Sequence, residues 1–540
     1  MSGVFVILSA AKDLLSRRFA RTVKARVPSS VPRHGTAQQA PRCAQDDRTL
    51  CAVVILVLGL VLASACAPQG EGPAPTPTTQ AATGDRAAPA AADNGTPVAA
   101  DAQRALALRR YGGAYTEGST AAYVERVGRQ LVTANALGTA DWRFTVLNSP
   151  TVNAFATERG EVFVTRGLLA VLQDEAELAA VMGHEMGHVL ARHAAQRRAQ
   201  EARIYQTALE VARSTRDPQL ALAFAEAELA QVRAYSRDQE FEADRIAIQL
   251  MTKAGYESAA AVRSLERLLE YNALQARVLG LPPDVFERQG RFATHPRTLD
   301  RVEAARAEVG DTAGGRRESD AYLDAVNGML YGDTPQEGYV RGRRFLHPRL
   351  GFAFEVPPGY ALLNNPQSVQ ARGPDNAYMM FACTTRRPEG DMVLAMRRLF
   401  SSVPLTDPKT LVINGFDAAT GVTPRSAESG DVDGRVVAID FAPGMCTFLL
   451  VSRALGSASR AHEMFSAAQT FRRLSSAEAE RLRPLRLMVV TVKPGDTAER
   501  LVARGPAVEG HRLERFLVLN GLQAGDRLVP GQRVRVVVSE

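Results

Sequence analysis

The chain has 540 residues, more than a single hydrophobic core usually fills, which indicates two to four domains. Its 46% hydrophobic and 23% charged residues are ordinary globular values and exclude a wholly disordered or fibrous protein. The net charge of +7 suggests a nucleic-acid or membrane-surface binder, but residues 1–50 alone hold nine Lys/Arg against three Asp/Glu. Because the rest of the chain is nearly neutral, we expect no nucleic-acid partner.

An apolar run near the N-terminus predicts export. Residues 52–65 carry no charge, and this run is too short to span a bilayer comfortably but typical of a signal peptide. It ends in Ala63-Ser64-Ala65-Cys66, which resembles a bacterial lipoprotein box with Cys66 as the lipidated residue. The alternative is ordinary cleavage at the same bond. We therefore expect a leader over 1–65, in which 1–49 are a mis-assigned start, and a periplasmic protein anchored to the membrane by lipid.

The segment that follows predicts a tether, and two later cysteines predict a crosslink. Residues 66–100 are rich in Pro, Ala and Thr and hold no aromatic residue, so they cannot build a core. Cys383 and Cys446 are the cysteines that remain after the leader and Cys66 are set aside. In an oxidising compartment these two are candidates for a disulfide.

Residues 142–165 predict a small antiparallel sheet. Two strand-like stretches, Trp142–Leu147 and Val152–Ala156, precede a turn at Glu158-Arg159-Gly160 and a third stretch, Val162–Thr165. A helix follows them. Asp174 and Glu177 have the spacing of a capping box at its start, and the helical pattern continues past His193.

This helix contains the sequence His184-Glu185-Met186-Gly187-His188. His184 and His188 are four residues apart and share one helix face, so both imidazoles can bind one metal ion. Glu185 lies about 100° around the helix, where its carboxylate reaches a metal-bound water as general base. His193 is nine residues from His184, so we expect it on the opposite face with a structural role.

A catalytic zinc site also needs a third protein ligand. A second predicted helix opens with Ser236 and carries Glu240 and Asp244 on one face, four residues apart. We expect Glu240 to be the third ligand of one zinc ion per chain and Asp244 to orient a ligand histidine. Glu242 points about 200° away from Glu240. The alternative is an exposed charge run on a solvated helix.

These motifs in combination resemble the HtpX/BepA/CAAX-prenyl-protease family of gluzincin metallopeptidases. The resemblance covers roughly residues 105–310 and includes Thr165-Arg166-Gly167-Leu168-Leu169 and Thr294-His295-Pro296 with Arg301 five residues beyond. It implies a zinc endopeptidase with His184, His188 and Glu240 as metal ligands, Glu185 as general base and His295 at the catalytic cleft. The chain lacks the several transmembrane helices of the HtpX and CAAX branches, so it is closer to the BepA-like periplasmic branch.

The segment Asn153, Ala154 and Phe155 is the candidate substrate strand. If it lies at a free sheet edge, it can hold an extended peptide by main-chain hydrogen bonds, which suits unfolded or misfolded envelope proteins. His295 is expected either to stabilise the tetrahedral oxyanion or to cover the metal in a resting state.

The C-terminal part predicts two further units. Residues 339–478 are rich in strands and faintly resemble small α+β domains of the PsbP type. Residues 485–540 resemble a LysM module of βααβ order, a family that binds glycans such as peptidoglycan; the alternative is a structural LysM-like fold.

The predicted architecture is therefore an α+β multidomain protein. It consists of a mainly helical zinc peptidase domain with a small antiparallel sheet (101–310), a linker (311–338), an α+β domain (339–478) and a LysM-like domain (485–540). The function that this predicts is a zinc-dependent endopeptidase of the bacterial cell envelope that cleaves misfolded or stalled envelope and outer-membrane proteins. The alternative is a non-catalytic chaperone or scaffold tethered to peptidoglycan.

Overall fold

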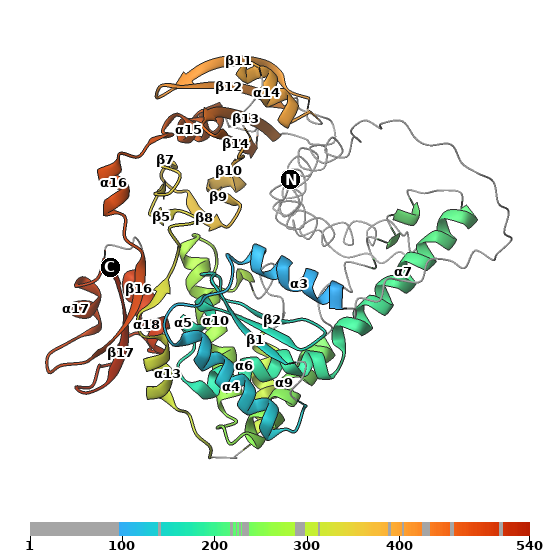
Figure 1. Cartoon of the computed structure of the whole chain (residues 1–540), viewed down its shortest axis with the longest axis vertical. Coiled ribbons are helices and arrows are strands. Elements are labelled where there is room, and N and C mark those ends of the chain that lie inside the picture. Colours follow the sequence, from blue (N-terminus) through green and yellow to red (C-terminus); the bar gives the residue numbers. More distant parts are fainter. Residues whose placement is uncertain are drawn as a thin grey trace, which may run out of the picture.

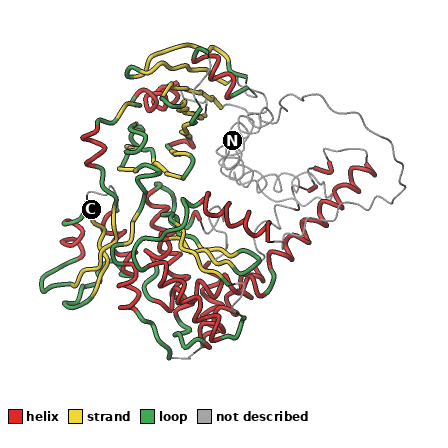
Figure 2. The backbone as a smooth tube through the Cα atoms, in the orientation of Figure 1, coloured by secondary structure: helices red, strands yellow, loops and turns green. Residues whose placement is uncertain are grey.

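The computed structural model describes residues 97–138, 142–215, 220–222, 224–225, 228, 237–286, 298–310, 314–386, 390–401, 404–423, 432–453, 458–506 and 511–539. The predicted leader with Cys66, most of the predicted tether, and His295 lie outside the described residues. In the part of the chain that is described, no helix is both long and apolar enough to cross a membrane. Helices and four separate sheets make up this part, so the protein is a multidomain α+β structure (Figures 1 and 2).

The N-terminal unit is mainly helical. Its elements are α3 (Pro97–Arg110), α4 (Thr120–Ala134), β1 (Arg143–Leu147), β2 (Ala154–Ala156), β3 (Glu161–Thr165), α5 (Arg166–Val171), α6 (Glu175–Leu190), α7 (His193–Thr215), α9 (Arg237–Lys253), α10 (Ala260–Val278) and α12 (Thr298–Val309). Val124, Val127 and Leu131 recur at helical spacing on α4 and are fully buried. They belong to one hydrophobic core with α6, α9, α10 and the small sheet.

The small sheet is mixed rather than antiparallel, which corrects the prediction. Its strand order is β1-β3-β2. The hairpin of β2 and β3 is antiparallel as predicted, with Gly160 at a φ of 83° in its turn. However, β1 pairs with β3 in parallel, because the hairpin lays its second strand, not its first, against β1. This order leaves β2 at the edge of the sheet.

A second unit is built around antiparallel sheets. A sheet of seven strands has the order β11-β12-β13-β14-β10-β9-β8, and one of four strands has the order β15-β7-β6-β5. The elements are β5 (Tyr339–Arg341), β6 (Arg344–His347), β7 (Phe352–Glu355), β8 (Ala361–Asn365), β9 (Ser368–Arg372), η4 (Pro374–Asn376), β10 (Tyr378–Cys383), α14 (Met392–Leu399), β11 (Thr406–Ile413), β12 (Phe416–Thr423), β13 (Val432–Phe441), β14 (Gly444–Arg453), α15 (Ala458–Gln469), β15 (Arg472–Arg473) and α16 (Ser476–Arg481). Buried aromatic rings, including Phe352, Phe381 and Phe471, fill its core.

The C-terminal unit has the predicted βααβ order. It consists of β16 (Leu485–Thr491), α17 (Ala498–Ala503), α18 (Arg512–Asn520) and β17 (Arg533–Ser539). Its sheet gains a third strand, β4 (Met329–Tyr331), which lies within the predicted linker of residues 311–338. The helix before it, α13 (Ser319–Val326), buries Tyr322 and Val326 in the core of the N-terminal unit. Residues 319–331 therefore bind the two units together.

Arg535 fixes the C-terminal unit to the segment between α5 and α6, the helix that carries the histidine motif. Its guanidinium is 1% exposed and donates to the carbonyl oxygens of Ala170 and Leu172, at 3.2 and 2.5 Å, at the end of α5. It also donates to the side chain of Gln173, which lies just before α6. Since a buried cation needs such partners, this contact is specific, and the C-terminal unit lies directly against the N-terminal unit (Figure 1).

A partly buried charge cluster joins the N-terminal unit to the β-rich unit. Arg166 at the start of α5 is 1% exposed, and the carboxyl groups of Asp333 and Glu337 lie within its electrostatic reach. Asp333 accepts hydrogen bonds from the backbone of Val340 (2.7 Å) and the side chain of Asn364 on β8 (3.2 Å). Burial and the neighbouring Asp333 raise the pKa of Glu337 to about 7, although Arg166 opposes this shift.

The raised pKa of Glu337 predicts a pH-dependent stability. Because the folded state holds the proton more tightly than the unfolded chain, this contribution is complete below the ordinary carboxyl pKa and is lost as the pH rises towards about 7. As the pH rises from about 4.5 to about 8, the urea midpoint of the wild type should therefore fall relative to that of Glu337→Gln, which cannot titrate at this position. Parallel midpoint curves over that range would show that Glu337 does not titrate there.

Cys383 on β10 and Cys446 on β14 are opposite one another and are joined by a disulfide across 63 residues of sequence. A crosslink over a loop of this length contributes on the order of 2–4 kcal/mol through the unfolded state. We expect the Cys383→Ser/Cys446→Ser variant to lose about this much free energy of unfolding in the β-rich unit. Reductant should destabilise the wild type but leave the variant unchanged, and equal responses in calorimetry would contradict the assignment.

Candidate metal and catalytic site

The histidine motif lies on α6, whose start is set by its N-cap. The carboxylate of Asp174 accepts a hydrogen bond from the backbone N–H of Glu177 at 2.8 Å, as the sequence predicts. One helical turn separates His184 from His188, and both side chains are buried beside Glu185. Glu185 and the two histidines are therefore all carried by one helix, α6.

A close helix contact brings the second helix to this motif. A Cβ placed on Gly187 would lie 3.0 Å from the carbonyl oxygen of Ala243 on α9, and one on Gly183 would lie 3.3 Å from the Cα of Ala247. Glycine and alanine at these four positions let the backbones of α6 and α9 approach closely. As a result Glu240, in the first turn of α9, reaches the face of α6 that carries the histidines.

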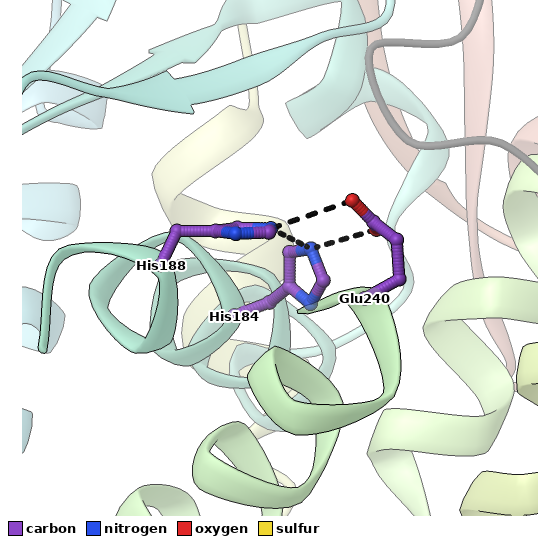
Figure 3. A group of neighbouring side chains, drawn as sticks. All are labelled: His184, His188 and Glu240. Atoms are coloured by element: carbon purple, nitrogen blue, oxygen red, sulfur yellow. Dashed lines mark hydrogen bonds and ion pairs between the residues drawn. The ribbon is translucent and has the colours of Figure 1, made fainter. Parts of the chain in front are cut away.

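His184, His188 and Glu240 converge on one point (Figure 3). The Nε2 atoms of the two histidines are 3.0 Å apart, and the Glu240 carboxylate oxygens lie 3.5 Å from His184 Nε2 and 3.7 Å from His188 Nε2. Ligand atoms of a tetrahedral zinc ion are separated by on the order of 3.3 Å, given bond lengths of about 2.0–2.1 Å. Two imidazoles and one carboxylate are also the donors of many catalytic zinc sites, so these residues fit such an ion.

Asp244 and Arg301 hold His184 from behind. Asp244 Oδ1 lies 2.8 Å from His184 Nδ1, the ring nitrogen that faces away from the cluster. Arg301, on α12, is 4% exposed and donates to both oxygens of Asp244, at 2.7 and 2.8 Å. Its Nη1 also lies 3.1 Å from Glu240 Oε2. Arg301 thereby neutralises two acids that would otherwise repel each other in a buried place.

The charges around His184 set its protonation. Burial and Arg301 disfavour the imidazolium, but Asp244 and Glu240 outweigh them and raise the pKa of His184 to about 9. Burial works against ionisation of Asp244 as well, yet Arg301 and His184 lower its pKa to about 2. Since metals bind the neutral imidazole, metal binding here should displace a proton and weaken as the pH falls.

His193 does not lie where the sequence placed it. The helix that was expected to continue past it ends at Leu190, and Arg192 takes a left-handed φ of 57°. The chain therefore turns before α7 begins, and His193 Nδ1 comes to lie 2.8 Å from His188 Nδ1. Its Nε2 is 3.2 Å from Glu242. No glycine marks this turn, so residue spacing alone could not reveal the contact.

The candidate substrate strand lies beside this site. Ala154 and Phe155 belong to the edge strand β2, which packs against α6, and Asn153 immediately precedes it. The Thr165 hydroxyl holds the approach to β2 by accepting from the Asn153 N–H at 3.1 Å and donating to the Thr151 carbonyl. His295, which the resemblance places at the catalytic cleft, lies outside the described residues.

Residues 118–309 match the family model of peptidase family M48. The mitochondrial metalloendopeptidase OMA1 of Schizosaccharomyces pombe is 29% identical over 207 residues, covering 38% of this chain and 57% of the relative. The β-barrel assembly-enhancing protease of Escherichia coli K12 is 32% identical over 194 residues, covering 34% of this chain and 38% of the relative. The chain thus matches less than two thirds of the length of these relatives.

The similarity of the chain to a solved PsbP structure is weak. The solution structure of PsbP from Synechocystis covers 26% of this chain and 98% of its own, at 11% identity and a TM-score of 0.20, which supports no fold assignment. The PsbP-like and LysM-like resemblances therefore stay predictions. The family match, by contrast, covers the helices that carry His184, His188 and Glu240. Residues 118–309 are therefore similar to peptidase family M48, and this region is also similar to the β-barrel assembly-enhancing proteases.

Proposed function

We propose that this chain is a zinc-dependent endopeptidase of the bacterial cell envelope, which cleaves misfolded or stalled envelope proteins. The observation that carries the proposal is the convergence of His184, His188 and Glu240 beside the buried Glu185. The M48 match and the endopeptidases among the relatives support peptide-bond hydrolysis. The name of the β-barrel assembly-enhancing proteases supports β-barrel proteins in assembly as the substrate class.

Zinc bound by these three residues would supply a Lewis acid that polarises the scissile carbonyl and lowers the pKa of water. Glu185, one residue after His184 on the same helix, would accept the proton of the attacking water and pass it to the leaving amine. Asp244 and Arg301 would hold His184 in place during this exchange, because their paired charges leave the imidazole one preferred orientation.

The edge strand β2 is the proposed substrate platform. An extended peptide can add to a sheet edge through main-chain hydrogen bonds, which need no particular side-chain sequence. Since β2 packs against α6, a peptide bound there lies near the histidine motif. Folded domains offer few such extended segments, so this platform favours unfolded chains.

The envelope location is supported by the predicted signal peptide and by lipidation at Cys66, which would anchor the protein to the membrane. A LysM-like unit over 485–540 would add binding to peptidoglycan. The second candidate function is a non-catalytic chaperone or scaffold held in the envelope by these contacts. Glu185 argues against it, because a metal site that only maintains shape has no need of an acid beside its ligands.

Replacing Glu185 by Gln separates the two functions. The purified protein should cleave a reduced and alkylated unfolded protein, and Glu185→Gln should lower kcat by at least about 100-fold while zinc content stays at one per chain, since the ligands are unchanged. Glu463→Gln is the matched control, because His462-Glu463 repeats the first two motif residues without a second histidine. A zinc-loaded wild type without any peptidase activity would favour the scaffold.

Replacement of acids on α9 tests the third ligand. Glu240→Ala should lose stoichiometric zinc, because it removes an oxygen that lies 3.5–3.7 Å from the two histidine nitrogens. Glu242→Ala, two residues away, should keep one zinc per chain when zinc is in excess. Metal analysis of both variants after equilibrium dialysis against the same buffer with excess zinc measures this difference. Loss of zinc from Glu242→Ala alone would overturn the assignment of Glu240.

A further inference from the structure

The two histidines of the motif are supported in different ways. His184 contacts a carboxylate directly, through Asp244. His188 instead contacts the ring of His193, and only beyond that ring does a carboxylate follow, from Glu242. The ring of His193 is 0% exposed, whereas the side chain of Glu242 is 45% exposed. The contacts that hold His188 therefore form a series that leads from the buried cluster, through His193, to Glu242 at the protein surface.

The distances determine how protons are arranged along this path. With 2.8 Å between the Nδ1 atoms of His188 and His193, one of them donates and the other accepts. His188 points Nε2 into the donor cluster, and a nitrogen that binds metal carries no proton, so the Nδ1 of His188 holds the N–H. His193 then accepts at Nδ1 and carries its own proton on Nε2. That N–H faces the Glu242 carboxylate, whose oxygen lies 3.2 Å from Nε2 and accepts the hydrogen bond.

We infer that Glu242 and His193 are positioning residues that act in series to hold His188 in its metal-binding tautomer and orientation. The inference rests on the proposed metal site. Each of the two imidazoles has a polar partner on both sides, so no alternative tautomer satisfies both contacts. Helical geometry permits this role for Glu242, because its side chain points away from Glu240 and contacts His193 at the start of α7.

The inference predicts the size of the effect on metal affinity. Partners that orient metal-ligating histidines typically change metal affinity by 10–100-fold when they are removed. His193→Phe keeps the size of a buried ring but removes the acceptor, so zinc should bind 10–100-fold more weakly. Glu242→Ala should weaken zinc in the same direction. His193→Asn, whose side-chain oxygen can replace Nδ1 as acceptor, should recover most of the lost affinity.

The test is a competition titration of zinc against a chromophoric chelator on the full-length protein, followed by the absorption spectrum of the Co²⁺-substituted protein. Asp238→Ala is the matched control for Glu242→Ala, because it removes the same charge one turn earlier on α9 from an exposed position. The double variant His193→Phe/Glu242→Ala completes a double-mutant cycle. Thermal unfolding of every variant reports the fold independently of the metal.

In the expected result the double variant binds zinc no more weakly than His193→Phe alone, because Glu242 acts only through His193. The Co²⁺ spectrum shifts in both single variants and stays as in wild type in Asp238→Ala. Additive losses, or zinc affinity within twofold of wild type in both single variants, would overturn the inference. If His193→Phe fails to fold, the zinc affinity and the Co²⁺ spectrum of Glu242→Ala, which changes a half-exposed side chain, test the inference instead. A wild type that binds no zinc would overturn the proposed function itself.

Discussion

The candidate site depends on the close packing of α6 against α9. Gly183 and Gly187 on one helix meet Ala247 and Ala243 on the other, and a Cβ on either glycine would approach the α9 backbone to 3.0–3.3 Å. Glycine inside a helix costs roughly 0.5–1 kcal/mol relative to alanine. Here that cost is offset by the buried contact of two helices whose remaining residues, such as Met182 and Met251, lie in the main core. Gly187 is itself part of the histidine motif and lies between His184 and His188. The glycine that permits the helix contact is therefore in the same helical turn as the two candidate metal ligands.

Once the helices are in contact, charge pairing decides which groups face the site. Glu240 and Asp244 are buried close together, an arrangement that is costly unless a cation compensates for it. Arg301 from α12 supplies this charge and reaches both acids at 2.7–3.1 Å. Burial of the two acids therefore depends on a residue of α12. The same pairing keeps Asp244 ionised and available to His184, so the stability of this region and the orientation of the site have one cause.

The units outside the peptidase domain are attached by specific polar contacts. Arg535 inserts from β17 between the end of α5 and the start of α6, and β4 extends the C-terminal sheet with a strand from residues 329–331. The C-terminal unit is thus held against the end of α5, just before the helix that carries the histidine motif. On the other side, Asp333 connects to Asn364 of the β-rich unit. A ligand that binds either unit would therefore bind a part of the protein that directly contacts the N-terminal unit, which carries the candidate site.

The sequence by itself determined the features that depend on local spacing. A four-residue interval places His184 and His188 on one helix face, and the same interval pairs Glu240 with Asp244, whatever the rest of the fold does. The capping residue Asp174, the β2–β3 hairpin and the βααβ order of the C-terminal unit follow from similarly local signals.

Contacts between distant segments were decided only by the tertiary structure. The parallel pairing of β1 with β3, the strand that residues 329–331 add to β16, and the insertion of Arg535 all join segments whose spacing holds no information about their meeting. His193 is the clearest case. Continued as a helix, the chain would carry it to the far side of α6, but a left-handed turn at Arg192 returns it to His188, because the buried imidazole finds its hydrogen-bond partners there.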